Sequence, residues 1–585
     1  MFAALPFPRL FAFCGKRLLV VICAVFGCFL CGLIAAAPGQ LDPTFGSNGI
    51  ITTELGDSLS NATLVFSLSD DKVLLVGACD VSKLSLCLTR YRANGLLDET
   101  FGVSGKSYLP TPEGEIYPVS GAPLTNGRLV VSGRCWLHGP YYYTQCIWLI
   151  DANGQLVSSF NGDGTPGYLR VDFGQTAYFD TAVAVIRDGS FLITGTCDTD
   201  LLSLCLAKVT STGHLDNTFG IGGIAKLRLS GFQFPGGVTP VVVRQDGKIL
   251  LSNSCTPNFA FYEVCVVRLL ENGGIDPTFG SRDTPGWFIS SYGGFVGVGG
   301  AMSVDNQQRI LLAGSCSDNG TVGSFCAVRL TPDGLADESY GQSAFAGLAF
   351  VPTSVVISGN PAATLQSDGA LVMAVTCKEK GNPLSYGQFC VARMMANGSI
   401  DTTFGMNGSG YVGAVVRGYV DYANAVASQR DGGVVVAGYC RAPVGSSTKH
   451  AFDFCAARFT GPHASASCAL NVDANGLALA DTDALLLTRY LLGFRGNALT
   501  NGALGANPTR TGQALETYLA SLNLDADGDG QALAMTDGLL ILRAMLGLTG
   551  TALTQGATNT AHPNVRNAQQ ILTWIESTHG VACLP

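Results

Sequence analysis

One six-residue phrase recurs along most of this chain and limits what it can fold into. LDPTFG at residues 41–46 returns as LDETFG (97–102), LDNTFG (215–220), IDPTFG (275–280), ADESYG (336–341) and IDTTFG (400–405), with a degraded copy, LVSSFN, at 156–161. The seven copies are spaced 56 to 64 residues apart. A period of this length indicates a repeat protein, in which each unit buries its apolar faces against its neighbours.

Each repeat contains apolar, β-rich runs on both sides of a tight turn. The turns fall at Asp70-Asp71, Asn126-Gly127, Asp188-Gly189, Asp246-Gly247, Asp305-Asn306, Asp368-Gly369 and Asp431-Gly432. Asn-Gly and Asp-Gly accept the positive φ angles of a two-residue hairpin. The runs predict four strands per repeat, and their nearly continuous apolar character predicts burial on both faces. We therefore expect a mainly β fold over residues 38–460, a seven-bladed β-propeller of four-stranded antiparallel blades. A β-helix, the alternative array, would need shorter coils and no hairpins.

Cysteines occur as one close pair in every repeat. The first member ends the strand after the hairpin turn and the second begins the next strand, so the two face each other across an antiparallel pair and lie close enough to bridge. Seven intrablade disulfides are predicted: Cys79–Cys87, Cys135–Cys146, Cys197–Cys205, Cys255–Cys265, Cys316–Cys326, Cys377–Cys390 and Cys440–Cys455. Paired cysteines indicate an oxidising compartment.

A cation stands three residues after the second cysteine in six repeats. The six are Arg90, Lys208, Arg268, Arg329, Arg393 and Arg458, and Leu149 takes the position in the second repeat. The series could form a cationic ring around a ligand, or a repeated structural pair with the Asp of the next phrase. We favour the structural pair, because the feature follows every repeat and does not mark a single site.

The order of phrases and strands suggests how a propeller would close. If the strand after each phrase is the outermost strand of the preceding blade, the last blade lacks one. Residues near 48–55 would then supply it, which would join the two ends of the propeller and leave no open edge.

The phrase, the DGKILL-type turn and the R-x-x-x-x-G-x-x-D spacing resemble the delta-60 repeat, a bacterial propeller-forming repeat. The resemblance covers residues 41–460. It implies a fold, and no activity or ligand comes with it.

The first 37 residues have the features of an export signal. Arg9, Lys16 and Arg17 precede an apolar run over residues 18–37 that ends in small residues at Ala35–Ala37. This pattern predicts a signal peptide, with cleavage at Ala36/Ala37 favoured. An uncleaved membrane anchor and a lipoprotein signal at Cys28 are the alternatives. We expect a secreted, cell-surface or periplasmic bacterial protein, in contact with a membrane only if the segment is retained.

After Gly461 the pattern changes to Ala- and Leu-rich helices, and a second duplication appears. NVDANGLALADTD (471–483) and DADGDGQALAMTD (525–537) each precede a helical segment, 54 residues apart. Alternating oxygen ligands followed by a later carboxylate suit calcium. The predicted ligands are Asp525, Asp527, Asp529, the Gln531 carbonyl and Asp537 in the second loop, and Asn471, Asp473, Asn475, the Leu477 carbonyl and Asp483 in the first.

Four carboxylates against two predict tighter binding of calcium by the second loop. The last Asp stands at position 13 of each loop, one later than in an EF-hand. Solvated acidic turns without a metal are the alternative for both loops.

The duplicated loop and helix with TRYLLG resembles type I dockerin. The resemblance implies a small α-helical domain over residues 461–585, up to two calcium ions at the residues named above, and a cohesin-like partner. The extra loop residue and the long connectors depart from the family. Cys468 and Cys583 bracket this region and are expected to join its ends.

The sequence carries no catalytic signature. GxSxG, HExxH and P-loop motifs are absent, and the six histidines do not cluster. A net charge of -9 without clustered Lys and Arg gives no nucleic-acid footprint. The sequence favours a non-enzymatic exported binding or scaffolding protein, with a propeller face that binds an extracytoplasmic protein or glycan. A secreted polysaccharide hydrolase or lyase is the first alternative, and a purely structural surface protein is the second.

Overall fold

The structure is a computed structural model. It describes residues 37–56, 59–68, 71–80, 84–109, 116–124, 127–137, 142–160, 164–173, 181–197, 203–234, 238–257, 263–290, 296–318, 321–341, 345–380, 387–405, 408–441, 452–461, 468–475, 478–505, 508–559, 562, 565–580 and 583–584. The expected export signal, residues 1–37, therefore lies almost entirely outside the described residues.

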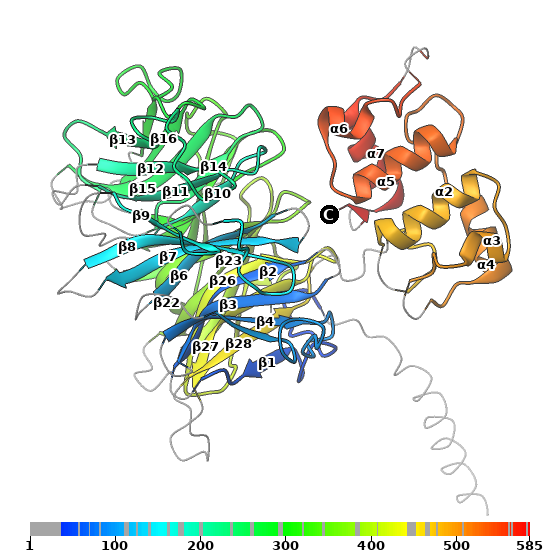
Figure 1. The fold of residues 1–585 in the computed structure, drawn as a ribbon, viewed down its shortest axis with the longest axis horizontal. Coiled ribbons are helices and arrows are strands. Elements are labelled where there is room, and N and C mark those ends of the chain that lie inside the picture. The colour runs from blue at the N-terminus through cyan, green and yellow to red at the C-terminus, as the bar shows by residue number, and fades with distance from the viewer. Residues whose placement is uncertain are drawn as a thin grey trace, which may run out of the picture.

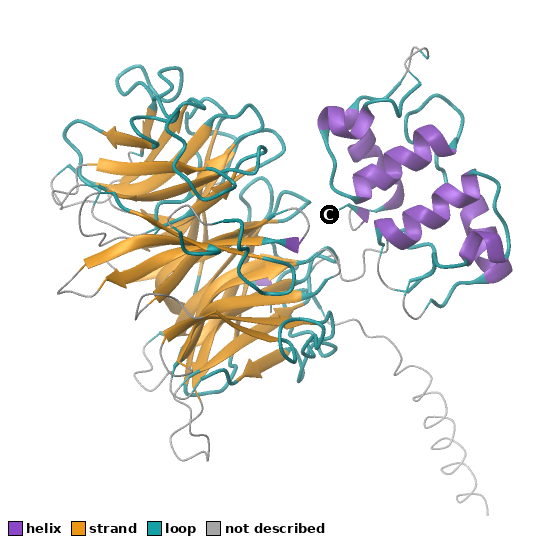
Figure 2. Cartoon of the chain, viewed as in Figure 1, coloured by secondary structure: helices purple, strands orange, loops and turns teal. Residues whose placement is uncertain are grey.

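Seven four-stranded antiparallel sheets form the larger part of the molecule, so the predicted seven-bladed propeller is confirmed (Figures 1 and 2). Blades 1 to 3 hold β2 (Ser60–Ser67), β3 (Val73–Asp80), β4 (Leu84–Tyr91) and β5 (Lys106–Leu109); β6 (Ile116–Pro123), β7 (Leu129–Leu137), β8 (Tyr142–Ile150) and β9 (Tyr168–Val171); β10 (Val183–Val185), β11 (Phe191–Thr196), β12 (Ser203–Val209) and β13 (Ile224–Arg228). Blades 4 to 6 hold β14 (Val241–Val243), β15 (Ile249–Cys255), β16 (Glu263–Leu269) and β17 (Trp287–Ile289); β18 (Val296–Val304), β19 (Ile310–Asp318), β20 (Thr321–Leu330) and β21 (Leu348–Pro352); β22 (Val355–Leu365), β23 (Leu371–Glu379), β24 (Gln388–Met394) and β25 (Tyr411–Ala414).

Blade 7 is made from both ends of the propeller sequence. Its strands are β26 (Val420–Ser428), β27 (Val434–Arg441), β28 (Asp453–Phe459) and, as the outermost strand, β1 (Ile50–Thr53). β1 pairs antiparallel with β28, with Ile51 opposite Ala456 (Figure 1). The predicted closure is confirmed, and it covers the edge that β28 would otherwise leave open.

The middle strands of the blades are buried on both faces, as their unbroken apolar runs predict. In β3 every residue except the last is buried. Side chains of adjacent blades pack into shared clusters, and one such cluster joins Val73 and Leu75 of blade 1 to Ala437 of blade 7. The aromatic residue of the phrase is buried in all seven copies: Phe45, Phe101, Phe160, Phe219, Phe279, Tyr340 and Phe404.

The hairpin turns differ from the prediction. In blade 3 the Ile186 N–H donates to the Ser190 carbonyl and the Gly189 N–H donates to the Ile186 carbonyl. Only Gly189, and not Asp188, has a positive φ, 82°. The loop is therefore a type I turn followed by one left-handed residue, which is a longer connection than the two-residue hairpin expected. In blade 5 the Gln308 N–H donates to the Asp305 carbonyl, and Gln308 is the left-handed residue, with φ 62°, so the turn begins at Asp305 and ends at Gln308.

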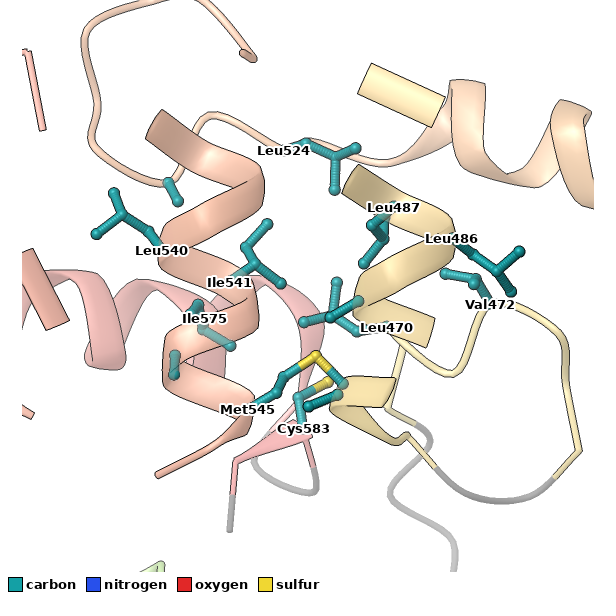
Figure 3. Close-up of a cluster of buried hydrophobic side chains, with 14 of the residues drawn as sticks. Leu470, Val472, Leu486, Leu487, Leu524, Leu540, Ile541, Met545, Ile575 and Cys583 are labelled. Atoms are coloured by element: carbon teal, nitrogen blue, oxygen red, sulfur yellow. The ribbon is translucent and has the colours of Figure 1, made fainter. Parts of the chain in front are cut away.

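A small helical module follows the propeller. Each half begins with a π-helical turn, η3 (Ala480–Ala484) or η4 (Ala534–Gly538), which runs into α2 (Leu485–Leu491) or α5 (Leu539–Met545). The other helices are α3 (Asn497–Thr500), α4 (Gly512–Ser521), α6 (Gly550–Thr554) and α7 (Ala568–His579). Leu487 of α2 and Ile541 of α5, which are duplicates of one another, meet in one buried core (Figure 3).

Eight disulfides join the sixteen cysteines named from the sequence, in the predicted pairs. The seven blade pairs have Cα atoms 5.7 to 6.0 Å apart, and Cys468 and Cys583 are 5.0 Å apart. This number of bridges is typical of a protein outside the cytoplasm. Within the described ranges no helix has the length and apolar character needed to cross a bilayer.

Candidate functional sites

The cations of the repeat are ion-paired with the phrase that follows them. Arg90, Arg268 and Arg329 each place Nε 2.8 Å from Asp98, Asp276 and Asp337 respectively, and Lys208 Nζ is 2.9 Å from Asp216. Arg393 and Arg458 reach Asp401 and Asp42 through Nη1, since their Nε atoms donate to Gln366 and Gln429. The structural-pair interpretation is confirmed, and no cationic ring is left free for a ligand among these six side chains.

Several of these arginines also join one blade to the next. Arg90 Nη1 donates to the Ala152 carbonyl at 3.1 Å, and Arg268 Nη1 donates to the Pro332 carbonyl at 2.8 Å. Each acceptor belongs to the following blade. In blade 2 the cation and its partner have both been replaced, by Leu149 and Val157, and both of these are buried. The joint replacement avoids an unpaired buried charge, which would be costly.

The two faces of the propeller differ in variability. The phrase face, which carries the phrases and the hairpin turns, has nearly the same turn in every blade, with a left-handed residue at Asp71, Gly127, Gly189, Gly247, Gln308, Gly369 and Gly432. The disulfide face, at the other end of the strands, carries loops of unequal length. Its paired cysteines are 8 residues apart in blade 1 and 15 apart in blade 7. Binding residues are expected where loops vary on a rigid scaffold, which is the disulfide face.

Blade 7 presents a group of aromatic rings on the disulfide face. Tyr422 and Tyr439 lie opposite each other on β26 and β27, and their rings stack at 4.8 Å. Phe452, just before β28, meets Tyr439 edge-on at 5.2 Å. The Arg441 guanidinium is 5.7 Å from the ring centres of both Tyr419 and Phe452. We call these five residues the blade-7 platform; all are partly exposed.

Sequence reasoning did not single out the blade-7 platform. The position before the first cysteine of each pair holds Ala78, Arg134, Thr196, Ser254, Ser315 and Thr376 in the other blades, and Tyr439 in blade 7. That departure is visible in an alignment of the repeats. The contacts of Tyr439 with Tyr422 and Phe452 need the strand register, which only the folded sheet supplies.

Buried charges beneath the platform fix the local backbone. Asp421 is fully buried and accepts hydrogen bonds from the N–H groups of Val416 and Arg417 at 2.8 and 3.1 Å. Burial raises the pKa of this carboxyl, although the hydrogen bonds from the backbone and the charge of Arg417 oppose the rise. Arg417 Nη1 lies 2.8 Å from Asp453 Oδ2. These groups hold the loop that enters blade 7, with Asp421 and Asp453 buried and Arg417 partly exposed.

The second acidic loop brings three carboxylates together. Oxygens of Asp525, Asp527 and Asp529 lie within 4.8 Å of one another. Asp527 is fully buried, and burial raises the pKa of its carboxyl, as do the charges of Asp537 and Asp529. Asn559 in the connector closes the loop, because its N–H donates to Asp527 and its side-chain amide donates to Asp529. An all-oxygen set of converging acids fits a hard divalent cation such as calcium.

Asp537 holds the loop backbone, and the π-helical turn explains its unusual position. Its carboxylate accepts from the N–H groups of Ala526, Asp527 and Leu533 at 2.7, 3.0 and 2.8 Å. The Gly538 N–H donates to Leu533, five residues back, at 3.1 Å. A π-helical turn takes up one extra residue, so position 13 lies where the carboxylate can still point back to the loop. The carboxylate of Asp537 is not part of the group of three.

The first loop repeats this arrangement with fewer charges. Asp483 accepts from the N–H of Val472 at 2.7 Å and of Leu479 at 2.9 Å, as Asp537 does in its own loop. Burial, together with the charge of Asp473, raises the pKa of Asp483 to about 6, against the hydrogen bonds that it accepts. Asn471 and Asn475 stand where the second loop has aspartates. Leu477 lies outside the described residues, and the Gln531 N–H donates to Asp529 at 2.9 Å.

One protein family matches the chain in sequence. A family described as a domain of unknown function, DUF5122 beta-propeller, matches residues 309–340. The match falls within blade 5 and agrees with the propeller fold. No curated protein sequence matches this chain.

Solved structures of propellers resemble the chain at low identity. An α-L-arabinofuranosidase from Fusarium graminearum is 7% identical, with a TM-score of 0.34, and the match covers 58% of this chain and 92% of that one. An ulvan lyase is 8% identical, with a TM-score of 0.35 and coverage of 73% and 94%. YCF48 bound to D1 peptide is 9% identical, with a TM-score of 0.35 and coverage of 73% and 99%. Likeness at this level concerns the fold alone.

These structures correct one expectation. The sequence favoured a non-enzymatic protein because it holds no familiar catalytic motif, yet the similar propellers include an arabinofuranosidase and a polysaccharide lyase. Absence of a motif therefore does not exclude catalysis in a chain of this fold, and the inference drawn from it was wrong.

Proposed function

We propose that this is an exported propeller protein that binds a polysaccharide on its disulfide face. The observation that carries the proposal is the difference between the two faces. The phrase face is occupied by ion pairs and by turns that are alike in all blades, whereas the disulfide face has loops of unequal length and the blade-7 platform. Aromatic side chains beside a few polar groups are typical of ligand sites. The same face would hold the substrate of a polysaccharide hydrolase or lyase.

The test compares binding and turnover on one set of polymers. The mature protein is run through gels containing neutral or acidic polysaccharides, and the same polymers are assayed for new reducing ends and for unsaturated products. Retardation by at least one polymer, lost in Tyr439→Ala and kept in Tyr117→Ala of blade 2, supports the proposal. Product release in the same samples would identify a hydrolase or a lyase. A mature protein that no polymer retards would overturn the assignment.

We propose that the helical module binds calcium at its two loops. The supporting observation is the group formed by Asp525, Asp527 and Asp529, whose carboxylate oxygens lie within 4.8 Å of one another. A cation bound there would offset their repulsion. Asp473, Asn471 and Asn475 would hold the second ion more weakly, and Asp483 and Asp537 would support the two loops. The dockerin resemblance, with a cohesin-like partner, remains part of this proposal.

Equilibrium dialysis of the mature chain against calcium tests the stoichiometry. Two ions per chain are expected, with Asp529→Asn losing one and Asp473→Asn losing the weaker one. Asp481→Asn is the matched control, because Asp481 is exposed on η3 outside the predicted ligand set. Equal binding by Asp529→Asn and the unaltered protein would contradict the assignment.

A further inference from the structure

The Arg441 side chain lies beside two aromatic rings and has no acidic partner among the described residues. Its guanidinium lies 5.7 Å from the ring centres of Tyr419 and Phe452. Within the described part of the chain, no carboxylate forms an ion pair with it and no acceptor takes a hydrogen bond from it. The repeat cations are different, since each has an Asp partner at the phrase face, as Arg268 has Asp276. Among the residues that the structure describes, Arg441 is therefore a cation that no carboxylate neutralises.

The rings around Arg441 form a surface suited to a flat, hydroxylated ligand. Tyr422 and Tyr439 stack with their planes 15° apart, and Phe452 stands at 88° to Tyr439. Tyr439 is thus in contact with Tyr422 and with Phe452, and the three rings together form one aromatic cluster. The tyrosine hydroxyls and the guanidinium supply donors at its margin. A sugar ring has one apolar face and a rim of hydroxyls, which matches this distribution of groups.

The platform lies where the propeller closes. The side of blade 7 that carries Tyr439 continues into the cluster of Phe454 and Ala437, which packs against Ile51 of β1 and Leu75 of blade 1. The strand register and the disulfide Cys440–Cys455 hold β27 and β28 together beside it. Tyr422 and Tyr439 are thus presented by paired strands, so little ordering of these two rings is needed when a ligand binds.

We propose that the blade-7 platform binds a uronic acid residue of an acidic polysaccharide, with the sugar ring against the aromatic cluster and the carboxylate paired with Arg441. A planar guanidinium donates two parallel hydrogen bonds to a carboxylate, and the partial shielding by two rings strengthens the pairing. This inference rests on the proposed function and names the ligand class of the same face. It assigns sugar binding to the four rings and charge selection to Arg441.

The experiment measures binding of the full mature chain to three polymers. Polygalacturonate supplies uronates, dextran sulfate supplies a different anion and dextran is neutral. Of the three polymers, polygalacturonate is expected to bind with the highest affinity. Arg441→Gln should lower this affinity by about tenfold or more, Arg441→Lys should lower it less, and added salt should weaken it. Tyr439→Ala should lose binding and Tyr439→Phe should keep it. The melting temperature of each variant shows that the propeller is intact, and Tyr117→Ala in blade 2 is the matched aromatic control.

The outcomes separate this inference from the proposed function. Equal affinity for polygalacturonate in Arg441→Gln and in the unaltered protein overturns the role of Arg441. Preference for dextran sulfate over polygalacturonate overturns uronate recognition in favour of non-specific charge. Binding of dextran that depends on Tyr439 and ignores Arg441 keeps the proposed function and overturns this inference. Binding to none of the three polymers overturns the uronate site, and the wider polymer set then decides the proposed function.

Discussion

Asp42, near the start of the propeller, forms an ion pair with Arg458 in its last blade strand. The Asp42 N–H also donates to the Arg458 carbonyl at 2.9 Å. In blade 1 the members of the same pair, Arg90 and Asp98, stand only 8 residues apart in the chain. The pair of Arg458 and Asp42 joins segments that are 416 residues apart in the chain. The closing pair thus uses the ordinary contact of the repeat at the one place where it connects the two ends.

Asp42→Asn should destabilise the propeller more than its position near the chain terminus would suggest. Loss of the negative charge weakens one contact of Arg458, which also pairs with Asp431, at a mostly buried site, at a cost of about 1–3 kcal/mol. Urea unfolding of the protein measures this loss of stability, with Thr44→Ala as a milder comparison, since Thr44 Oγ1 only donates to Asp42, at 2.7 Å. Removal of residues 38–53 should have a larger effect and promote self-association through the exposed β28 edge. An unchanged melting curve after this deletion would contradict the closure.

Acid should weaken the propeller between about pH 4 and pH 2. Burial opposes ionisation of Asp98, but hydrogen bonds from Thr100 and the charges of Arg90 and Lys72 outweigh it and lower the pKa of Asp98 to about 2. Hydrogen bonds from Thr218 and Lys208 lower the pKa of Asp216 to about 2. The carboxyls ionise near pH 3.9 in the unfolded chain, to a rough approximation. The unfolded state therefore binds more protons in this range, so stability is complete above it and declines as the pH falls.

Urea midpoints measured at unit steps from pH 6 to pH 2 check this. Asp98→Asn should have a shallower decline below pH 4 than the unaltered protein, because one depressed carboxyl is gone. A decline of the same steepness in both proteins would show that other groups control the acid unfolding.

The two kinds of left-handed turn residue predict opposite effects of substitution. Gln308→Gly should stabilise by about 1 kcal/mol, since a side chain at φ 62° crowds its own backbone. Gly189→Ala should destabilise by a similar amount, about 1 kcal/mol, for the same reason. A Cβ at Gly189 would meet nothing closer than 3.8 Å, so the substitution causes no steric clash and its effect measures backbone strain alone. Thermal unfolding of both variants gives the comparison, and shifts of the same sign would refute it.

Replacing Cys468 and Cys583 by serine should affect the helical module and leave the propeller unchanged. The bridge closes 115 residues, so its removal should cost the module about 4–5 kcal/mol in the chain-entropy treatment. Cys79 and Cys87 close only 8 residues, and their loss should cost about 2–3 kcal/mol in the propeller. Calorimetry that resolves two transitions would assign each loss. Calcium should raise the module transition alone, and chelation should reverse the rise.

The repeat explains why so much of the scaffold could be predicted. Because the phrase, the turn and the cysteine pair recur in phase, blade number, disulfide pairing and the Arg–Asp contact follow from one copy. The turn type could not be predicted from one copy, since Asp188-Gly189 is compatible both with a two-residue hairpin and with a type I turn followed by a left-handed residue. The role of Asp537 did not follow either, because spacing shows a carboxylate at position 13 but not the π-helical turn that directs it to the backbone of Ala526.

What the sequence determined by itself is the periodic part: seven blades, their bridges and the strand that closes them. These depend on short-range contacts repeated in every copy, so their signal adds up along the chain. Tertiary structure alone decided which non-repeated residues meet. Tyr422, Tyr439 and Phe452 come from three strands or strand ends, and they form one surface only when the register of blade 7 is set. Arg458 finds Asp42 for a related reason, because closing the ring brings the first phrase to the last blade.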